Sequence, residues 1–395
     1  MNKNNDVRQP WQKERQTILD NANLLVIKVG SAVLADDNGL DMGIMQNLAR
    51  QMAQLRNTGK EGRLFVLVSS AAVAAGRAKL ARDVQGTHDT NGLAAKQAVA
   101  AIGQCQLMQA WDRAFQPYGI PTAQVLLTRD DLRARQRFLN ARNTFSELLS
   151  WGVLPIVNEN DTVSVQELKF GDNDSLASLL VNLVGGQVCI NLTSAPGVRA
   201  NNPQINPDAP ILDYIDDAAS LDLNRMCGGK TTVGTGGMYS KLRAAQRTAQ
   251  IGVPTLILPG REQDILIKAF AGEFPCGTWI RPASHAISRR KFWLAYQSDP
   301  SGSILIDQGA AKALQHNGSS LLPGGICRVD GNFQKGALVR VNHDGNNIGV
   351  GLSNYSAADL KKIMGLRRHE VAAILGDAHY PEVIHRDNFL LEAAL

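Results

Sequence analysis

Two lysines beside glycine-containing turns are the residues of this chain best suited to chemistry. Lys28 lies in the apolar run 24–29 and precedes Gly30. A buried lysine costs desolvation energy unless it is paired, and a glycine lets an anion approach the backbone closely. Lys241 follows the glycine-rich segment 234–237, at the start of an expected helix, where backbone N–H groups can bind phosphate. Together they indicate phosphoryl transfer by positioning and charge neutralisation.

Each of these lysine motifs also has a simpler interpretation. Lys28 could be a strand-end lysine that reaches solvent, and residues 234–237 could be a flexible loop before a solvated lysine. The second motif is not a P-loop, because the G-x-x-x-x-G-K-[ST] spacing is absent.

Polar residues follow two further apolar runs. Residues 69–70 are two serines directly after the run 64–68, and could either cap a helix or bind a carboxylate. The Asn/Asp clusters 158–161 and 171–174 follow the run 154–157. They could be two turns, but they could also lie beside one strand end and hold an ammonium group or order a lysine. We therefore expect a polar ligand site here.

Other chemistry finds little support in the composition. The seven histidines show no metal-ligand spacing, and no G-x-S-x-G elbow is present. The five cysteines are dispersed without a C-x-x-C pair, which argues for reduced thiols in a cytoplasmic protein rather than a disulfide framework. The formal net charge of +5 among 395 residues is too small to indicate nucleic acid binding by itself.

No membrane or export segment is expected. The N-terminal residues 1–13 are polar, which does not fit a signal peptide. The longest apolar stretch, 176–192, contains Asn182 and the pair Gly185–Gly186, so it predicts a helix end, a break and a buried strand rather than a membrane-spanning helix.

The apolar runs and helical patterns alternate over the first 260 or so residues. Strands buried on both faces with helices between them predict an α/β fold, a three-layer αβα sandwich with a mainly parallel sheet. Ligands in such folds lie beyond the carboxyl ends of the strands, where the polar residues fall. The expected strands are 24–29, 64–68, 122–127, 153–157, 188–192 and 253–258, and the main expected helices are 42–55, 71–80, 93–115 and 237–251.

The pattern changes near residue 262. Short strands at 304–306, 324–329, 337–342 and 347–352, with turn signals between them, predict a small, mostly β domain. We expect the chain to divide into a polar N-terminal extension (1–21), an α/β domain (22–262), a linker (263–300), the mostly β domain (301–382) and a C-terminal tail (383–395).

Between about residues 24 and 385 the chain resembles the bacterial glutamate 5-kinases. The residues that carry this resemblance are 26–30, 73–77, 137–142, 157–161, 171–174 and 234–238. The family combines an amino-acid-kinase domain with, in many members, a C-terminal PUA domain. Residues 319–326, 331–333 and 354–356 resemble that PUA domain.

The resemblance implies ATP-dependent, Mg²⁺-assisted phosphorylation of the γ-carboxylate of L-glutamate, the first step of proline biosynthesis. It implies that Lys28 and Lys241 bind the phosphates and that Asp174 holds both lysines in place. The implied glutamate-binding residues are Ser70, Asn158, Asp161 and Asn173. The implied nucleotide-binding residues are Lys28, Thr193, Ser194, Thr235, Gly236, Gly237, Met238, Tyr239, Ser240 and Lys241. No residue is expected to hold a metal ion by itself.

The chain departs from the family pattern at two places. The usual Ser-Gly-Ala is Ser70-Ala71-Ala72 here, and the usual Thr-Asp-Gln-Lys is Thr193-Ser194-Ala195-Pro196. Because an acid and a lysine near the nucleotide are missing, we expect weaker ATP binding and less base discrimination.

Two alternatives remain open from the sequence. One is a kinase-like protein with a weakened nucleotide site that acts as a sensor or interaction partner. The other is RNA binding through the PUA-like domain, although nine basic and nine acidic residues balance from residue 301 onward. The resemblance further implies a cytoplasmic homo-oligomer and a glutamyl-phosphate reductase as a partner.

Overall fold

The computed structural model describes residues 8–36, 38–58, 62–84, 90, 92–163, 173–227, 237–284, 286–296, 300–375 and 380–391. It divides the chain into two compact units, Met1–Ala286 and Ile287–Leu395. Within the described part of the chain, no helix is both long and apolar enough to span a bilayer.

The first unit is built on an eight-stranded sheet with the strand order β10-β12-β11-β7-β1-β4-β6-β5. The pairs are parallel except for β11 with β12, which confirms the expected mainly parallel sheet. The strands are β1 (Leu24–Val29), β4 (Leu64–Ser69), β5 (Thr122–Leu127), β6 (Leu154–Glu159), β7 (Val188–Thr193), β10 (Tyr214–Ile215), β11 (Thr255–Pro259) and β12 (Thr278–Ile280). Short two-residue pairs, β2 (Ala35–Asp36) with β3 (Gly39–Leu40) and β8 (Val198–Arg199) with β9 (Ile211–Leu212), lie outside it.

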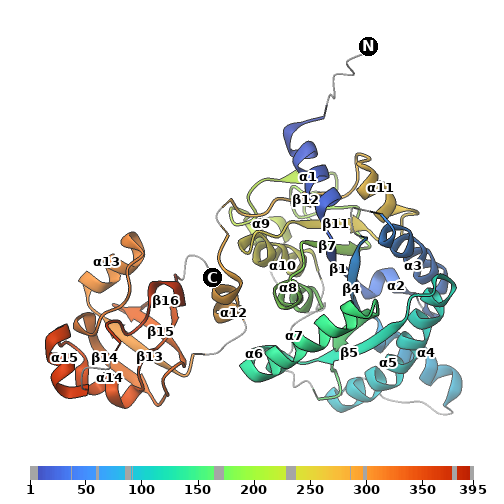
Figure 1. Cartoon of the computed structure of the whole chain (residues 1–395). Coiled ribbons are helices and arrows are strands. Elements are labelled where there is room, and N and C mark those ends of the chain that lie inside the picture. Colours follow the sequence, from blue (N-terminus) through green and yellow to red (C-terminus); the bar gives the residue numbers. More distant parts are fainter. Residues whose placement is uncertain are drawn as a thin grey trace. The chain divides into compact units, whose positions relative to one another are not determined.

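Helices cover both faces of this sheet, which gives the predicted three layers (Figure 1). Leu25 and Ile27 of β1 pack with residues of α3 and α5 in the main core, whereas Ile257 of β11 packs with α10 on the opposite face. The helices are α1 (Pro10–Asn21), α2 (Ser31–Leu34), α3 (Met42–Arg56), α4 (Ala72–Asp83), α5 (Leu93–Phe115), α6 (Arg129–Arg133), α7 (Arg135–Ser150), α8 (Asn173–Val184), α9 (Leu223–Cys227), α10 (Met238–Gln250) and α11 (Ile265–Ala271).

Helices α4 and α5 pack backbone against backbone. A Cβ atom on Gly103 would lie 1.7 Å from the carbonyl oxygen of Ala72, and one on Gly76 would lie 1.9 Å from that of Val99. Only glycine fits at such a crossing. The close packing matters for function because α4 begins just after β4, and α5 carries Gln104 and Trp111, which reach the ends of β6 and β4.

The segment 1–21 was expected to be a polar extension. It contains helix α1, which packs on the sheet domain. Leu19 is fully buried in the main core. Arg15 is also buried, donates to the carbonyl oxygen of Ala269 at 3.1 Å, and lies over the ring of Phe274. Burial lowers the pKa of Arg15, although the guanidinium stays charged at neutral pH.

The second unit contains a five-stranded sheet with the order β14-β13-β15-β16-β17. Trp293 of the helix 289–296, within the range expected to be a linker, packs against Leu338, Val350 and Leu390 of this sheet. The strands are β13 (Gly302–Ile306), β14 (Ile326–Gly331), β15 (Leu338–His343), β16 (Asn346–Leu352) and β17 (Phe389–Leu391), and the helices are α12 (Arg289–Tyr296), α13 (Gln308–Asn317), α14 (Ala357–Ile363) and α15 (Arg368–Leu375).

Candidate active site

The carboxyl ends of four neighbouring strands bring the predicted residues together. Lys28 is the last but one residue of β1, and Ser70 directly follows β4. Asn158 is near the end of β6, and Thr193 ends β7. The N-terminus of α8, with Asn173 and Asp174, meets the same edge of the sheet, as the hydrogen bonds below show.

Asp174 is the centre of the charged part of the site. Its Oδ1 lies 2.6 Å from Nζ of Lys28 and accepts a hydrogen bond of 2.7 Å from Nδ2 of Asn191. Its Oδ2 accepts from Nζ of Lys241 at 3.0 Å and from the hydroxyl of Ser240 at 2.7 Å. One carboxylate therefore holds both lysine ammonium groups.

These charges are buried. Asp174 is fully buried, and Lys28 and Lys241 are 3% and 4% exposed. Burial alone would raise the pKa of Asp174, but the charges of Lys28 and Lys241, with hydrogen bonds from Lys28 and Ser240, outweigh it and lower the pKa to about 2. Two positive charges and one negative charge leave a net charge of +1 at the strand ends.

The strand register explains why Lys28 points into this cluster. Leu25, Ile27 and Val29 of β1 face the main core. Successive side chains of a strand alternate between faces, so Lys28 faces α8 and α10. Gly30 donates to the carbonyl oxygen of Leu192 at 3.1 Å, and a Cβ there would lie 3.7 Å from Nζ of Lys28. The glycine leaves that space beside the ammonium group open.

The second part of the site is neutral. Nδ2 of Asn173 donates to the hydroxyl of Ser70 and to Oδ1 of Asn158, both at 2.8 Å. Asn158 in turn donates to Oε1 of Gln104 at 2.9 Å. Three of the four residues expected to bind glutamate are thus joined directly. Asp161, the fourth, lies in the turn that follows β6.

Ala71 carries the backbone from β4 into α4 in a left-handed conformation, with φ +85° and ψ 8°. It is one of the positive-φ residues of the described chain that are not glycine. Ser69, the last residue of β4, accepts a hydrogen bond of 2.7 Å from the indole of Trp111. Ala71, the N-cap of α4, is therefore strained, at the position where the family pattern has glycine.

The expected nucleotide residues are only partly described. Thr193 is buried at the end of β7, whereas Ser194 and Pro196 are exposed. Gly237 is the N-cap of α10, and Met238, Tyr239 and Ser240 form the first turn of that helix. Thr235 and Gly236 lie outside the described residues.

Asn191, Gln104 and Trp111 were not expected from the sequence. Asn191 had a detectable signal, since it is a polar residue inside an apolar strand, as Lys28 is. Gln104 and Trp111 lie in a long helix, and no local pattern separates them from ordinary helix residues.

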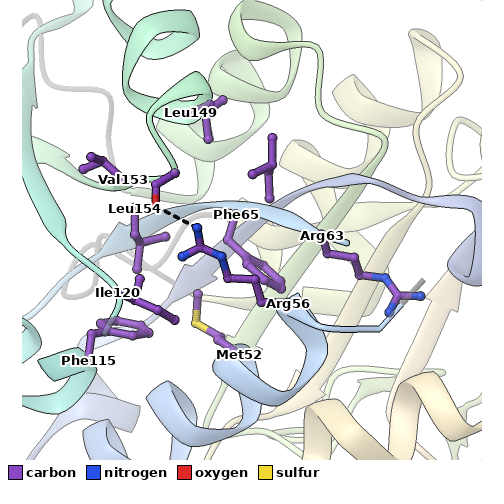
Figure 2. Close-up of a pocket in the computed structure, with 11 residues that line it drawn as sticks. Met52, Arg56, Arg63, Phe65, Phe115, Ile120, Leu149, Val153 and Leu154 are labelled. Atoms are coloured by element: carbon purple, nitrogen blue, oxygen red, sulfur yellow. Dashed lines mark hydrogen bonds between the residues drawn. The ribbon is translucent and has the colours of Figure 1, made fainter. Parts of the chain in front are cut away.

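Figure 2 shows a pocket at the opposite end of the sheet, where Leu154 begins β6. Arg56 donates there to the carbonyl oxygen of Gly152 at 2.8 Å, among apolar side chains that include Phe65 and Ile120. This pocket is separate from the cluster around Asp174.

Comparison with known proteins agrees with this architecture. Residues 23–259 match the amino acid kinase family, and residues 302–375 match the PUA domain. The glutamate 5-kinase of Nitratidesulfovibrio vulgaris is 61% identical over 386 residues, covering 98% of this chain and 100% of that protein. The glutamate 5-kinase of Geobacter sulfurreducens is 47% identical over 380 residues, covering 95% and 100%.

Among solved structures, the isopentenyl phosphate kinase of T. acidophilum in its product complex aligns with a TM-score of 0.45 and 15% identity. That alignment covers 66% of this chain and 100% of the other. The family match and the full-length relatives establish the class. The chain belongs to the amino acid kinase family, and within it to the glutamate 5-kinases.

Proposed function

We propose that this protein transfers the γ-phosphoryl group of ATP to the γ-carboxylate of L-glutamate, giving glutamyl 5-phosphate and ADP. The observation that carries this proposal is the buried Lys28–Asp174–Lys241 cluster directly beside the neutral Asn173 network. The full-length relatives that bear the name glutamate 5-kinase support the same substrate pair.

The charged cluster would serve the phosphoryl group. The γ-carboxylate of glutamate is ionised at neutral pH, with an ordinary pKa of about 4.3, so it can attack without a general base. One carboxylate oxygen forms a bond to the γ-phosphorus, the bond to the bridging oxygen of ADP breaks, and ADP carries away that electron pair. Lys28 and Lys241 stabilise the charge that spreads over the transferred group.

The neutral network would orient glutamate. Ser70, Asn158 and Asn173 offer amide and hydroxyl groups, which can bind carboxylate and ammonium groups without adding charge. Asp161 would accept from the α-ammonium group of glutamate. Because Asn173 and Asp174 are consecutive, the bound amino acid would lie next to the lysines, which favours the proximity that the transfer requires.

The nucleotide would bind along Thr193, Ser194 and the segment 235–241, with its phosphates toward the N-terminus of α10. Ser194 supplies a hydroxyl where an acid would supply a charge, so we propose weaker ATP binding and less base discrimination than an aspartate there would give. Mg²⁺ would be held chiefly by the phosphates, as is common for this ion. Asp174 is a poor candidate for a ligand, because its oxygens already accept four donors.

A hydroxamate assay tests this proposal. Hydroxylamine traps an acyl phosphate as a hydroxamate, so colour should form only when ATP, Mg²⁺ and glutamate are all present. Running ATP and GTP in parallel tests base discrimination. Absence of hydroxamate at saturating ATP and glutamate, with a folded protein, would contradict the proposed reaction and favour the sensor alternative.

We further propose a cytoplasmic homo-oligomer whose product passes to a glutamyl-phosphate reductase. The chemistry supports such a partner, because an acyl phosphate is readily lost to water unless the next step is fast.

A further inference from the structure

Asn191 is a buried amide in the middle of β7. Its side chain is 3% exposed, and in the sheet register it lies between Lys28 of β1 and Ile257 of β11. Nδ2 of Asn191 donates to Oδ1 of Asp174 at 2.7 Å. Its own Oδ1 is buried and has no hydrogen-bond partner among the described residues. Half of this amide is therefore satisfied, and half is not.

A buried amide with an unpaired oxygen lowers the stability of the fold, so stability alone does not explain its presence. An unpaired buried carbonyl oxygen loses its hydration without compensation. A leucine has nearly the same shape and would bury without that cost. The flipped amide would set Oδ1 against the carboxylate of Asp174, so the orientation is determined by Asp174. What the residue contributes must therefore lie in the hydrogen bond that it donates.

The four contacts of Asp174 show what that bond does. Oδ1 contacts Lys28 and Asn191, and Oδ2 contacts Lys241 and Ser240. In the proposed reaction the lysines must turn N–H groups toward the phosphate. Asn191 is neutral and anchored in the strand, so it stays with Oδ1 when Lys28 is drawn to the phosphate.

We propose that Asn191 is a positioning residue for phosphoryl transfer: it keeps the Asp174 carboxylate fixed and ionised while Lys28 engages the transferred group. This inference rests on the proposed kinase function.

Among the residues that the structure describes, few ionisable groups face Asp174. They are Lys28 on β1, Lys241 on α10 and the thiol of Cys189 on β7, whose pKa burial and the charge of Asp174 raise to about 12. Strand β4 carries no ionisable side chain. Below neutral pH, Asp174 is thus the group of this cluster that titrates.

Two substitutions separate positioning from packing. Asn191→Leu removes the donor and excludes water, so kcat should fall about 10- to 100-fold, the loss expected for one charge-assisted hydrogen bond. The KM values for glutamate and ATP should stay within about twofold, because Asn191 acts on the transfer rather than on binding. Asn191→Ala leaves room for a water, which can donate to Asp174 in its place.

The expected order of kcat is therefore wild type, then Asn191→Ala, then Asn191→Leu. Stability should follow a different order, since the alanine leaves a cavity and the leucine fills it. Ile190→Val, on the same strand but facing the main core, is the matched control and should lower stability slightly without changing kcat. Wild-type kcat in Asn191→Leu, or a lower kcat in Asn191→Ala than in Asn191→Leu, would overturn the inference.

The pH dependence of unfolding tests the inference without catalysis. Asp174 has a lowered pKa in the folded state. It therefore adds stability that is fully present above its unfolded pKa of about 3.9 and is lost as the pH falls through the folded pKa. Without Asn191 the pKa is lowered less, so Asn191→Leu should lose less stability than wild type between pH 7 and about pH 3.

This measurement also separates the two proposals. A wild type that makes no hydroxamate contradicts the kinase function. A smaller loss of unfolding free energy on acidification in Asn191→Leu than in wild type would still support the contact that anchors Asp174. If wild type and Asn191→Leu lose the same unfolding free energy on acidification, the inference is overturned even in an active enzyme.

Discussion

Asn173 and Asp174 are consecutive residues at the start of α8, yet they belong to networks of opposite character. Asp174 is fully buried among two ammonium groups, and its contacts are ionic. Asn173 is partly buried and joins Ser70 and Asn158 through neutral hydrogen bonds. The two networks meet at one peptide bond.

The difference shows how one helix N-terminus can serve two binding tasks. On the charged side, a fixed net charge of +1 matches a group whose negative charge grows in the transition state. On the neutral side, amides and hydroxyls can select a zwitterionic amino acid by shape and hydrogen bonding.

The largest effect should come from removing the positive charges. Lys28→Ala and Lys241→Ala should each lower kcat by about 100-fold or more, since each removes a preorganised stabilising charge. Steady-state kinetics of the hydroxamate reaction would measure this. Lys268→Ala is a suitable control, because Lys268 is a partly exposed lysine that pairs with Glu262. If kcat is unchanged in both site variants, the cluster does not serve the phosphoryl group.

The glutamate side should respond in KM rather than in kcat. Asp161→Asn should raise the KM for glutamate about 10- to 100-fold, the loss of one charge-assisted contact to the ammonium group. The KM for ATP in the same titrations is the internal control and should stay near the wild-type value. A change in the KM for ATP with none for glutamate would place Asp161 on the nucleotide side.

The sequence predicts the sheet of the first unit well because its strands are buried on both faces and read as apolar runs. The expected ranges 24–29 and 122–127 match β1 and β5 to the residue. The packing role of α1 was not expected, because one of its two buried residues, Arg15, is charged and the helix is mostly polar. Helix α12 was missed because it packs on the sheet of the second unit, and such a contact leaves little local signal.

The candidate site was predicted as a set of residues but not as two networks. Local spacing cannot show that Lys28 and Asn191 stand side by side, since that depends on the register of β1 with β7. It also cannot show which oxygen of Asp174 each donor contacts. The roles of the expected site residues stay predictions until the variants are measured.

The smallest expected effect concerns the backbone of the neutral side. Ala71 has φ +85°, a conformation that costs a residue with a Cβ about 1–2 kcal/mol. Glycine avoids this cost but loses about 0.4–1 kcal/mol through its greater freedom in the unfolded chain. Ala71→Gly should therefore raise the free energy of unfolding by roughly 0.5–1 kcal/mol, which denaturant titration can resolve.

Ala74→Gly, inside α4 with right-handed backbone, is the matched control and should lower stability by up to about 1 kcal/mol. The two substitutions remove the same methyl group, so opposite signs can only come from the backbone. Because the substitution removes no side chain of the charged cluster, kcat should stay near its wild-type value in Ala71→Gly. Equal destabilisation by both variants would mean that Ala71 is not left-handed in solution, and that the neutral side holds glutamate without stored backbone strain.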